Sequence, residues 1–427
     1  MEKIDKIAII GGGSSYTPEF IDGIITREND LHVGEVALFD VDEARLRIVG
    51  GMVQRQVQHA ELDTRITLTL SRPQALEGAR FIASQMRVGQ MAARIRDEKL
   101  PLKHGVLGQE TTGPGGTLKA WRTIPVALDI ARDVEKYAPS AWYLNFTNPS
   151  GIITEALLKH TNMKVVGLCN NPINMQRQMA LMLGVRDEQL FLEWIGLNHV
   201  NWVRRIFLDG QDVTQRVFGA LGESMDGLPF DPELVRTLGV LPTYYLKYYY
   251  DHPLALAEAK AAPKSRGEVV LEVEKELFAK YQDPHQVVMP PELSLRGGAL
   301  YSEAAIRLIL SLHLDRRDVQ IVVTRNAGAI PDLEDDASVE VPCVVGAHGV
   351  TPLHMGRLPE TIRALCQQAK AWESWTVEAG VTGSRRAALM AMLVNPLVPS
   401  FEVAKALLDE MLEANRAYLP QFFPVAG

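Results

Sequence analysis

Cys169 and His199 are a thiol and an imidazole, far apart in the chain, that could bind one metal ion together. One thiolate and one imidazole would leave coordination positions for water and substrate hydroxyls, as a catalytic metal requires. Cys169 has no second cysteine near it in the sequence, so the ligand count excludes a structural zinc site. The alternative is that both side chains only pack in the core, as single buried cysteines and histidines usually do.

A glycine-rich turn near the start of the chain, Gly11–Gly12–Gly13–Ser14–Ser15–Tyr16, could hold a dinucleotide. It follows a strand pattern and opens a helical one, where free N–H groups and the helix dipole can bind a pyrophosphate. Tyr16 replaces the third glycine of the usual fingerprint, so a plain tight turn is the alternative. Asp40 ends the second strand pattern, where a carboxylate binds ribose hydroxyls and repels a 2′-phosphate. The sequence therefore predicts NAD rather than NADP, with contacts from Gly11, Gly13, Ser14, Ser15 and Asp40.

Polar residues also follow three later strand patterns, at residues 85–87, 145–149 and 169–172. The carboxyl ends of parallel strands meet at one edge of a sheet, so these residues should converge beside the nicotinamide. Each cluster taken alone could be only a polar loop with an Asn-Pro turn.

Two further groups could serve catalysis or binding. Five tyrosines lie between Pro242 and Asp251. A tyrosinate near a metal and a cationic ring could act as a base. The alternative is that the cluster belongs to the core or to an interface, as such clusters more often do.

Arg94 and Arg296 have polar, glycine-adjacent neighbours, so each could bind a phosphate. Surface salt bridges are the alternative.

The elements that must position these residues alternate between strand and helix up to about residue 168, which is typical of a parallel sheet. Thr17 should cap the first helix, with Pro18 at the first helical position. Antiparallel strands are expected at 191–195 and 203–208, and the chain beyond residue 231 should be mostly helical. The predicted strands of the first part are 6–10, 35–40, 65–70, 80–85, 141–145 and 164–168. The clearest later helices are 268–281, 303–312 and 358–379, with strands at 319–324 and 339–345.

The fold class predicted from this order is α/β, a Rossmann-like doubly wound parallel sheet with a second, mixed α+β, mostly helical domain. We expect a NAD-binding domain over residues 1–170. Residues 171–427 should form a substrate, metal and oligomerisation domain packed tightly on the first.

Composition and charge narrow the classes of partner. The 427 residues carry a net charge of −8 with no basic block, which argues against nucleic acid or an anionic membrane. The longest apolar runs are far shorter than the roughly 20 residues of a membrane span. Three cysteines and a start without a cationic, then apolar, signal indicate a cytoplasmic protein.

Taken together, these motifs closely resemble glycoside hydrolase family 4, the NAD- and metal-dependent glycosidases. The resemblance covers nearly the whole chain. It implies that Cys169 and His199 hold the metal, usually manganese, although ligand softness alone would suggest zinc or iron. Tyr245 aligns with the family's base, and Tyr244 is the alternative. The most specific segments are residues 9–19, 108–116, 145–151, 169–172, 196–199 and 296–299.

The resemblance also implies the reaction and its ligands. The sugar is oxidised at carbon 3, loses a proton at carbon 2, eliminates the aglycone, gains water and is reduced again. The substrate would be a phosphorylated disaccharide or glycoside, and the protein a homodimer or homotetramer. Arg94, Asn148, Asn170 and Arg296 would contact the substrate, with Arg87 competing and Asn148 also near the cofactor.

One position bears on the anomer. Family members that act on α-linked substrates carry an aspartate directly after the metal cysteine, whereas this chain has Asn170, an amide that cannot act as a general acid. The resemblance therefore implies a 6-phospho-β-glucosidase. The alternatives are an α-specific or non-phosphorylated-substrate member of the family, a 2-hydroxy-acid dehydrogenase, and a non-catalytic NAD-sensing module.

Overall fold

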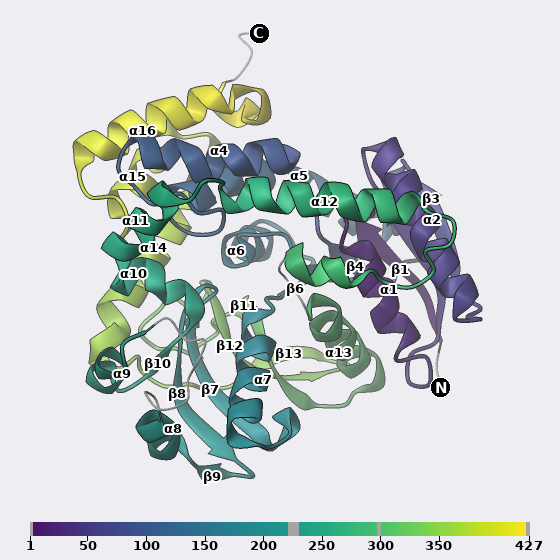
Figure 1. The fold of residues 1–427 in the computed structure, drawn as a ribbon, viewed down its shortest axis with the longest axis horizontal. Coiled ribbons are helices and arrows are strands. Elements are labelled where there is room, and N and C mark those ends of the chain that lie inside the picture. The colour runs from purple at the N-terminus through teal and green to yellow at the C-terminus, as the bar shows by residue number, and fades with distance from the viewer. Residues whose placement is uncertain (1–2, 221–229, 297–299, 424–427) are drawn as a thin grey trace.

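A nine-stranded sheet forms the centre of the protein in the computed structural model, which describes residues 3–220, 230–296 and 300–423 (Figure 1). Its strand order is β13-β12-β11-β6-β5-β4-β1-β2-β3. The six strands from β3 to β6 pair in parallel, so the predicted doubly wound sheet is confirmed. They are β1 (Ile4–Ile10), β2 (Val33–Phe39), β3 (Arg65–Thr69), β4 (Phe81–Ser84), β5 (Trp142–Asn145) and β6 (Lys164–Gly167).

Both faces of this sheet are covered, which explains why its strands are almost continuously apolar. Ile7 and Ile9 of β1 pack in one core with residues of α1 (Thr17–Ile25) and α13 (Tyr301–Leu314). The alternating residue Ile10 belongs to a second core. That core includes residues of α5 (Gly113–Tyr137), α6 (Ser150–His160), α14 (Glu360–Thr382), α15 (Arg385–Val394) and α16 (Phe401–Ala414).

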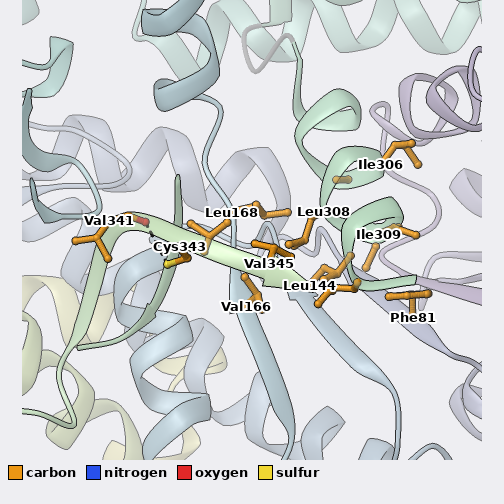
Figure 2. Packing of buried hydrophobic residues seen from close by; sticks show 14 of the residues in the cluster. Phe81, Leu144, Val166, Leu168, Ile306, Leu308, Ile309, Val341, Cys343 and Val345 are labelled. Carbon is orange, nitrogen blue, oxygen red and sulfur yellow. Dashed lines mark hydrogen bonds between the residues drawn. The ribbon is translucent and has the colours of Figure 1, made fainter. Parts of the chain in front are cut away.

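Strands from the later part of the chain extend the sheet beyond β6. They are β11 (Asp318–Arg325), β12 (Ser338–Gly346) and β13 (Gly349–Pro352), and all pair antiparallel. Val323 of β11 pairs with Gly167, where a β-carbon would come within 2.8 Å of the Val323 side chain. Figure 2 shows Val341 and Cys343 of β12 packed in one core with Val166 and Leu168. The sheet therefore combines residues from both predicted domains, and the boundary at residue 170 stays a prediction.

A second, smaller sheet has the order β10-β8-β7, with β9 paired to β8. Its strands are β7 (Leu190–Leu197), β8 (Val200–Leu208), β9 (Gln211–Asp212) and β10 (Leu241–Pro242). The remaining helices are α2 (Glu43–His59), α3 (Arg72–Leu76), α4 (Gln90–Lys103), α7 (Asn171–Leu183), α8 (Thr214–Ala220), α9 (Pro232–Leu238), α10 (Lys247–Tyr250), α11 (His252–Ala261) and α12 (Arg266–Gln282). In the described ranges, none of the helices has the length and apolar character needed to cross a membrane.

The first helix starts one residue earlier than predicted. Thr17 is its first residue, Tyr16 takes the N-cap position, and no side chain caps the helix. The Thr17 hydroxyl instead donates to the Gly12 carbonyl (2.9 Å) and accepts from the Gln85 amide (2.8 Å). The predicted cap was wrong because Gln85, in the loop after β4, binds this hydroxyl.

Candidate active site

The polar residues that end the parallel strands converge at one edge of the sheet, as predicted from the topology. The Gln85 side chain after β4 donates to the Gly11 carbonyl after β1 (3.3 Å). The hydroxyls of Ser84 and Thr147 lie 3.1 Å apart and join the ends of β4 and β5. These bonds bring the glycine turn and the Asn-Pro loop to one place.

Asp40 and Gly13 form the centre of the candidate dinucleotide site. The Gly13 N–H donates to the Asp40 carboxylate (2.8 Å), which fixes the glycine turn against the end of β2. A β-carbon on Gly13 would lie 2.9 Å from that carboxylate oxygen, so the close approach requires glycine. Gly11 has φ +86° and its missing β-carbon faces the backbone of Gln85 at 3.1 Å. The glycine turn and the acidic strand end fit a ribose and pyrophosphate.

Ser15 is oriented away from this turn. It is fully buried, its hydroxyl donates to Glu274 of α12 (3.1 Å), and its carbonyl accepts from the Tyr281 hydroxyl (2.9 Å). Ser14 keeps its side chain at the turn, where the hydroxyl accepts from the Tyr16 N–H (3.3 Å). The Ser15 side chain therefore anchors the turn to α12, and any cofactor contact from Ser15 must come from its backbone.

Cys169 and His199 lie together in the folded protein, with Sγ and Nε2 3.6 Å apart. Cys169 follows β6, and His199 belongs to the two-residue connection between β7 and β8. His199 has φ +68°, an uncommon left-handed conformation for a non-glycine residue. Within the described residues, no group of three or more His, Cys, Asp or Glu side chains is arranged to hold a metal. The pair thus offers two protein ligands.

The protonation states of this pair suit a metal ion. Burial, with a further contribution from Lys119, lowers the pKa of His199 to about 3, so the imidazole is neutral near pH 7. Burial and the Glu340 carboxylate raise the pKa of the Cys169 thiol. A coordinated cation reverses that shift, because a coordinating thiol is deprotonated. A neutral imidazole beside this thiol fits a divalent cation.

Tyr245 stacks on the imidazole of His199, with ring centroids 4.0 Å apart and planes at 22°. Burial, followed by the charges of Cys169, Tyr248 and Glu110, raises the pKa of Tyr245. The Thr111 side chain lies beside the Tyr245 hydroxyl and works to lower that pKa. Tyr244, the alternative, is 46% exposed, and its hydroxyl accepts from Lys247 (2.8 Å). The geometry brings Tyr245, and not Tyr244, to the metal pair.

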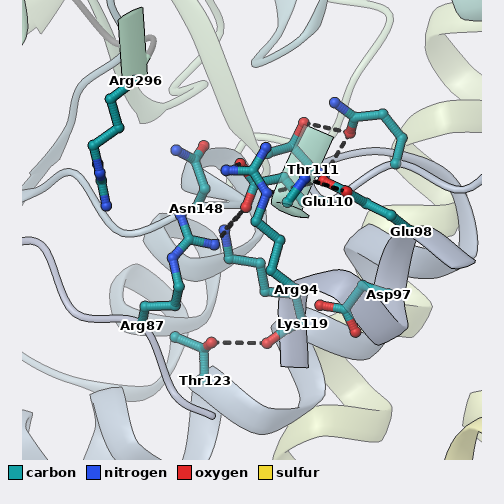
Figure 3. A network of polar contacts seen from close by, with 12 residues as sticks. Arg87, Arg94, Asp97, Glu98, Glu110, Thr111, Lys119, Thr123, Asn148 and Arg296 are labelled. Carbon is teal, nitrogen blue, oxygen red and sulfur yellow. Dashed lines mark hydrogen bonds and ion pairs between the residues drawn. The ribbon is translucent and has the colours of Figure 1, made fainter. Parts of the chain in front are cut away.

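Three basic side chains surround the partly buried carboxylate of Glu110 (Figure 3). Arg87 lies 2.5 Å, Lys119 2.9 Å and Arg94 3.0 Å from its oxygens. Burial alone would raise the pKa of Glu110, but these cations hold it well below its usual value. Arg94 also pairs with Glu98 (2.9 Å), yet the three basic groups still outnumber these two carboxylates, which favours an anionic ligand.

Glu110 and Lys119 were not predicted from the sequence as site residues. Glu110 lies in the segment 108–116, which carries part of the family resemblance but implied no role for any single residue. Lys119 lies in the second turn of α5 and had no local signal, because its importance comes from contact with Glu110.

Arg296 and Asn148 lie on the other side of this cluster, where Figure 3 shows Arg296 reaching toward Asn148 and Arg87. The Arg296 guanidinium lies 4.0 Å over the Tyr16 ring and 3.4 Å from Glu274. Asn148 donates to the Tyr301 hydroxyl (3.4 Å), and its carbonyl oxygen is buried without a partner among the residues described. Residues 297–299, which follow Arg296 in its motif, lie outside the described part.

Asn170, the position that bears on the anomer, is next to Cys169 and takes the N-cap position of α7. The structure therefore brings Cys169, His199, Tyr245, Arg94, Asn148, Asn170 and Arg296 to the same edge of the sheet as the glycine turn.

Comparison with known proteins gives the family. The sequence profile of "Family 4 glycosyl hydrolase" matches residues 6–185, and that of "Family 4 glycosyl hydrolase C-terminal domain" matches residues 194–398. The chain belongs to glycosyl hydrolase family 4.

Relatives within family 4 match over almost their full length. A "Probable 6-phospho-beta-glucosidase" of Bacillus subtilis (strain 168) is 47% identical, covering 99% of each chain. A 6-phospho-beta-glucosidase of Escherichia coli (strain K12) is 38% identical, covering 98% of this chain and 96% of that one. A solved structure of the 6-phospho-beta glucosidase from Thermotoga maritima, with manganese, NAD+ and glucose-6-phosphate, superposes with a TM-score of 0.92 at 38% identity over 97% of this chain and 99% of that one.

Proposed function

We propose that this chain is a 6-phospho-β-glucosidase that requires NAD and a divalent metal, Mn²⁺, the cation present in the solved structure of the Thermotoga maritima relative. The observation that carries the proposal is the contact of Cys169 and His199, 3.6 Å apart, with the Tyr245 ring stacked on the imidazole. The relatives named 6-phospho-beta-glucosidase support this substrate class.

The chain offers a separate set of residues to each cofactor. Asp40 would bind the ribose, and Gly11, Gly13 and Ser14 the pyrophosphate of NAD, while Cys169 and His199 would hold the cation. When bound, NAD and the cation supply hydride acceptance and Lewis-acid polarisation to the sugar.

Tyr245 is the residue proposed to remove the proton from carbon 2 of the sugar. The ring of Tyr245 is stacked on His199 and its phenol lies beside Thr111, so its position is set by the protein and not by the substrate. Burial raises the pKa of Tyr245, which disfavours the phenolate. The positive charge of Arg94, which lies close enough to interact with Tyr245, works in the opposite direction.

The 6-phosphate is proposed to bind among Arg296, Arg94 and Asn148. Arg296 has a buried Nε without a hydrogen-bond partner among the residues described, so it retains donor capacity for an anion. Arg94 is already held by Glu98 and Glu110, which fits a supporting role. Asn148 offers an amide at the same place, beside Tyr301.

The β-anomer is proposed because Asn170 follows Cys169. An amide at this position cannot protonate a leaving group, whereas an aspartate could. The substrate's own aglycone must then leave with a proton from solvent or from another group.

The test is an assay of aryl α- and β-glucosides, with and without a 6-phosphate, in deuterated water with NAD and Mn²⁺. Cleavage of the 6-phospho-β-glucoside alone, with deuterium at carbon 2 of the released sugar, is expected. Cleavage of the α-anomer or of the unphosphorylated substrate would assign another specificity within the family. Net NADH accumulation without cleavage would show that the protein is a dehydrogenase. NAD binding without turnover of any glycoside would show that it is a NAD sensor.

Assembly and location complete the proposal. A cytoplasmic homodimer or homotetramer is expected, and light scattering coupled to gel filtration would measure the subunit number.

A further inference from the structure

A chain of buried hydrogen bonds joins strand β12 to the segments that carry His199 and Tyr245. Glu340 of β12, which is 0% exposed, accepts from the Asn198 side chain (2.9 Å), the Trp194 indole (3.1 Å) and the Asn201 side chain. Asn201 in turn accepts from the Thr243 hydroxyl (2.6 Å). We call Asn198, Asn201, Thr243 and Glu340 the buried clamp.

The direction of every bond in the buried clamp is set by its surroundings. Asn198 accepts from the Gly151 N–H (3.2 Å), so its NH₂ group must face Glu340. Asn201 donates to the Leu197 carbonyl (2.9 Å) and accepts from Thr243, which fixes its amide as well. Glu340 therefore accepts hydrogen bonds from N–H groups only. A carboxylate can accept them with both of its oxygens, whereas an amide has one oxygen to accept with.

The buried clamp holds both sides of the candidate metal site. Asn198 and His199 are the two residues that connect β7 and β8, so fixing Asn198 leaves His199 little freedom. His199 keeps a left-handed φ of +68°, a conformation that persists only when its surroundings enforce it. The Asn198 amide binds both the Glu340 carboxylate and the Gly151 N–H at the start of α6, and it lies beside the Cys169 thiol.

The second branch leads to Tyr245. Thr243 precedes the 3₁₀ turn Tyr244–Leu246, and its carbonyl accepts from the Leu246 N–H (2.9 Å). Its own N–H donates to the Asn201 carbonyl (3.2 Å), so backbone and side chain of Thr243 are both tied to β8. The turn that carries Tyr245 is thereby attached to the strand that follows His199.

We propose that Glu340 is a positioning residue that sets the metal-binding imidazole of His199 and the phenol of Tyr245 in register, by binding Asn198 and Asn201. This rests on the proposed function, since it assumes that His199 binds the metal and that Tyr245 acts on the substrate. Glu340 belongs to β12 of the nine-stranded sheet, far in sequence from His199 and Tyr245. A strand of the large sheet would thus control the geometry of the site.

The main test replaces Glu340 by Gln, which keeps the shape but turns one acceptor into a donor that faces a fixed N–H group. Partners that orient metal ligands typically contribute 10–100-fold to metal affinity, so the E340Q protein should bind Mn²⁺ at least about tenfold more weakly. Its kcat should fall with it, while its NAD affinity stays unchanged. Isothermal titration with Mn²⁺ alone and with NAD alone measures both affinities without relying on activity.

A milder variant separates the two branches and keeps the proposal testable if the E340Q protein does not fold. Thr243→Val removes only the hydroxyl that binds Asn201. We expect a lower kcat with unchanged Mn²⁺ affinity, because the imidazole branch stays intact. An unchanged kcat in the T243V protein would overturn the Tyr245 branch.

Asp332→Asn is the matched control, since Asp332 is also a buried carboxylate, bound by Arg357, Arg363 and the Leu358 N–H. It should lower the melting temperature without weakening Mn²⁺ binding. If D332N and E340Q proteins lose Mn²⁺ affinity equally, Glu340 is only structural and the inference fails. If Cys169→Ser leaves Mn²⁺ binding unchanged, the proposed metal site itself is wrong, which is a separate outcome.

Discussion

The rings of His199 and Tyr245 stack in parallel, at 4.0 Å between centroids and 22° between planes. One ring belongs to a hairpin tip and the other to a 3₁₀ turn after β10, and both are attached to β8. The stack therefore places a candidate base directly against a proposed metal-binding side chain.

Tyr245→Phe should lower kcat by about 10²–10⁴-fold, the usual contribution of a general base. The ring and its stacking remain, so Mn²⁺ and NAD affinities should be retained. Loss of deuterium incorporation at carbon 2, followed by NMR, measures the missing proton transfer. Tyr244→Phe is the control, because that ring is 46% exposed and packs on Lys247. A fully active Y245F protein with an inactive Y244F protein would reverse the assignment.

Cys169→Ser should abolish Mn²⁺ binding and glycoside cleavage, since a serine hydroxyl is a far weaker ligand than a thiolate. NAD affinity should stay close to that of the parent protein, because Asp40 and the glycine turn are untouched. Cys343→Ser serves as the control, since Cys343 is a buried core residue on β12. Mn²⁺ titrations of the three proteins measure the effect, and equal affinities would contradict it.

Arg296→Ala should reduce kcat/KM for the 6-phosphorylated substrate by about tenfold to a hundredfold, as expected for the loss of a charged hydrogen-bond donor. Activity on an unphosphorylated analogue, if measurable, should change little. Arg177→Ala removes an arginine paired with Glu303 on α13 and provides the control. Equal losses on both substrates would argue that Arg296 supports the fold through Tyr16 and Glu274 instead.

Gly13→Ala should weaken NAD binding by about tenfold or more, because the added methyl group overpacks the turn. The new β-carbon would lie 2.9 Å from the Asp40 carboxylate and 3.0 Å from the Arg45 side chain. Gly51→Ala is the control, since its β-carbon meets only the end of Arg55 at 3.5 Å, within helix α2. That change should leave NAD affinity intact and raise the melting temperature slightly. Fluorescence titration with NAD decides the result.

Glu155 should make stability depend on pH. Burial alone would raise its pKa, but Lys370 and Lys159 lower it to about 2 from 4.5. Between these values the unfolded chain binds more protons than the folded one, so the free energy of unfolding falls as the pH decreases from 4.5 toward 2. Glu155→Gln should weaken this dependence. Urea denaturation at several pH values measures it, and identical slopes in both proteins would count against the pairing with Lys370.

Local sequence patterns determined much of the first half of the fold. Apolar runs such as 6–10 and 164–168 predicted the parallel strands because each is buried on both faces, and that pattern needs no knowledge of the partner strand. The glycine turn and Asp40 were recognisable for the same reason, since their backbone requirements lie within one βαβ unit. The family motifs added Cys169, His199 and Tyr245 as candidates.

Other features were outside the reach of local patterns. The cap at Thr17 was predicted wrongly because Gln85, far along the chain, competes for its hydroxyl. The side chain of Ser15 turns to Glu274 for a similar reason. Neither contact leaves a signal in the sequence around the residue, because pairing of β1 with β4 brings Gln85 close and packing of α12 brings Glu274 close.

The sequence by itself thus determined which residues could bind a dinucleotide, a metal and a phosphate, because residue type sets chemistry. Only the tertiary structure decided that the Cys169 thiol meets His199, that Tyr245 and not Tyr244 lies on that imidazole, and that Glu340 fixes the hairpin tip. Distances between side chains depend on how segments far apart in the chain pack together. In a buried network, the donor and acceptor of each hydrogen bond depend on all the neighbouring groups, which local sequence does not specify.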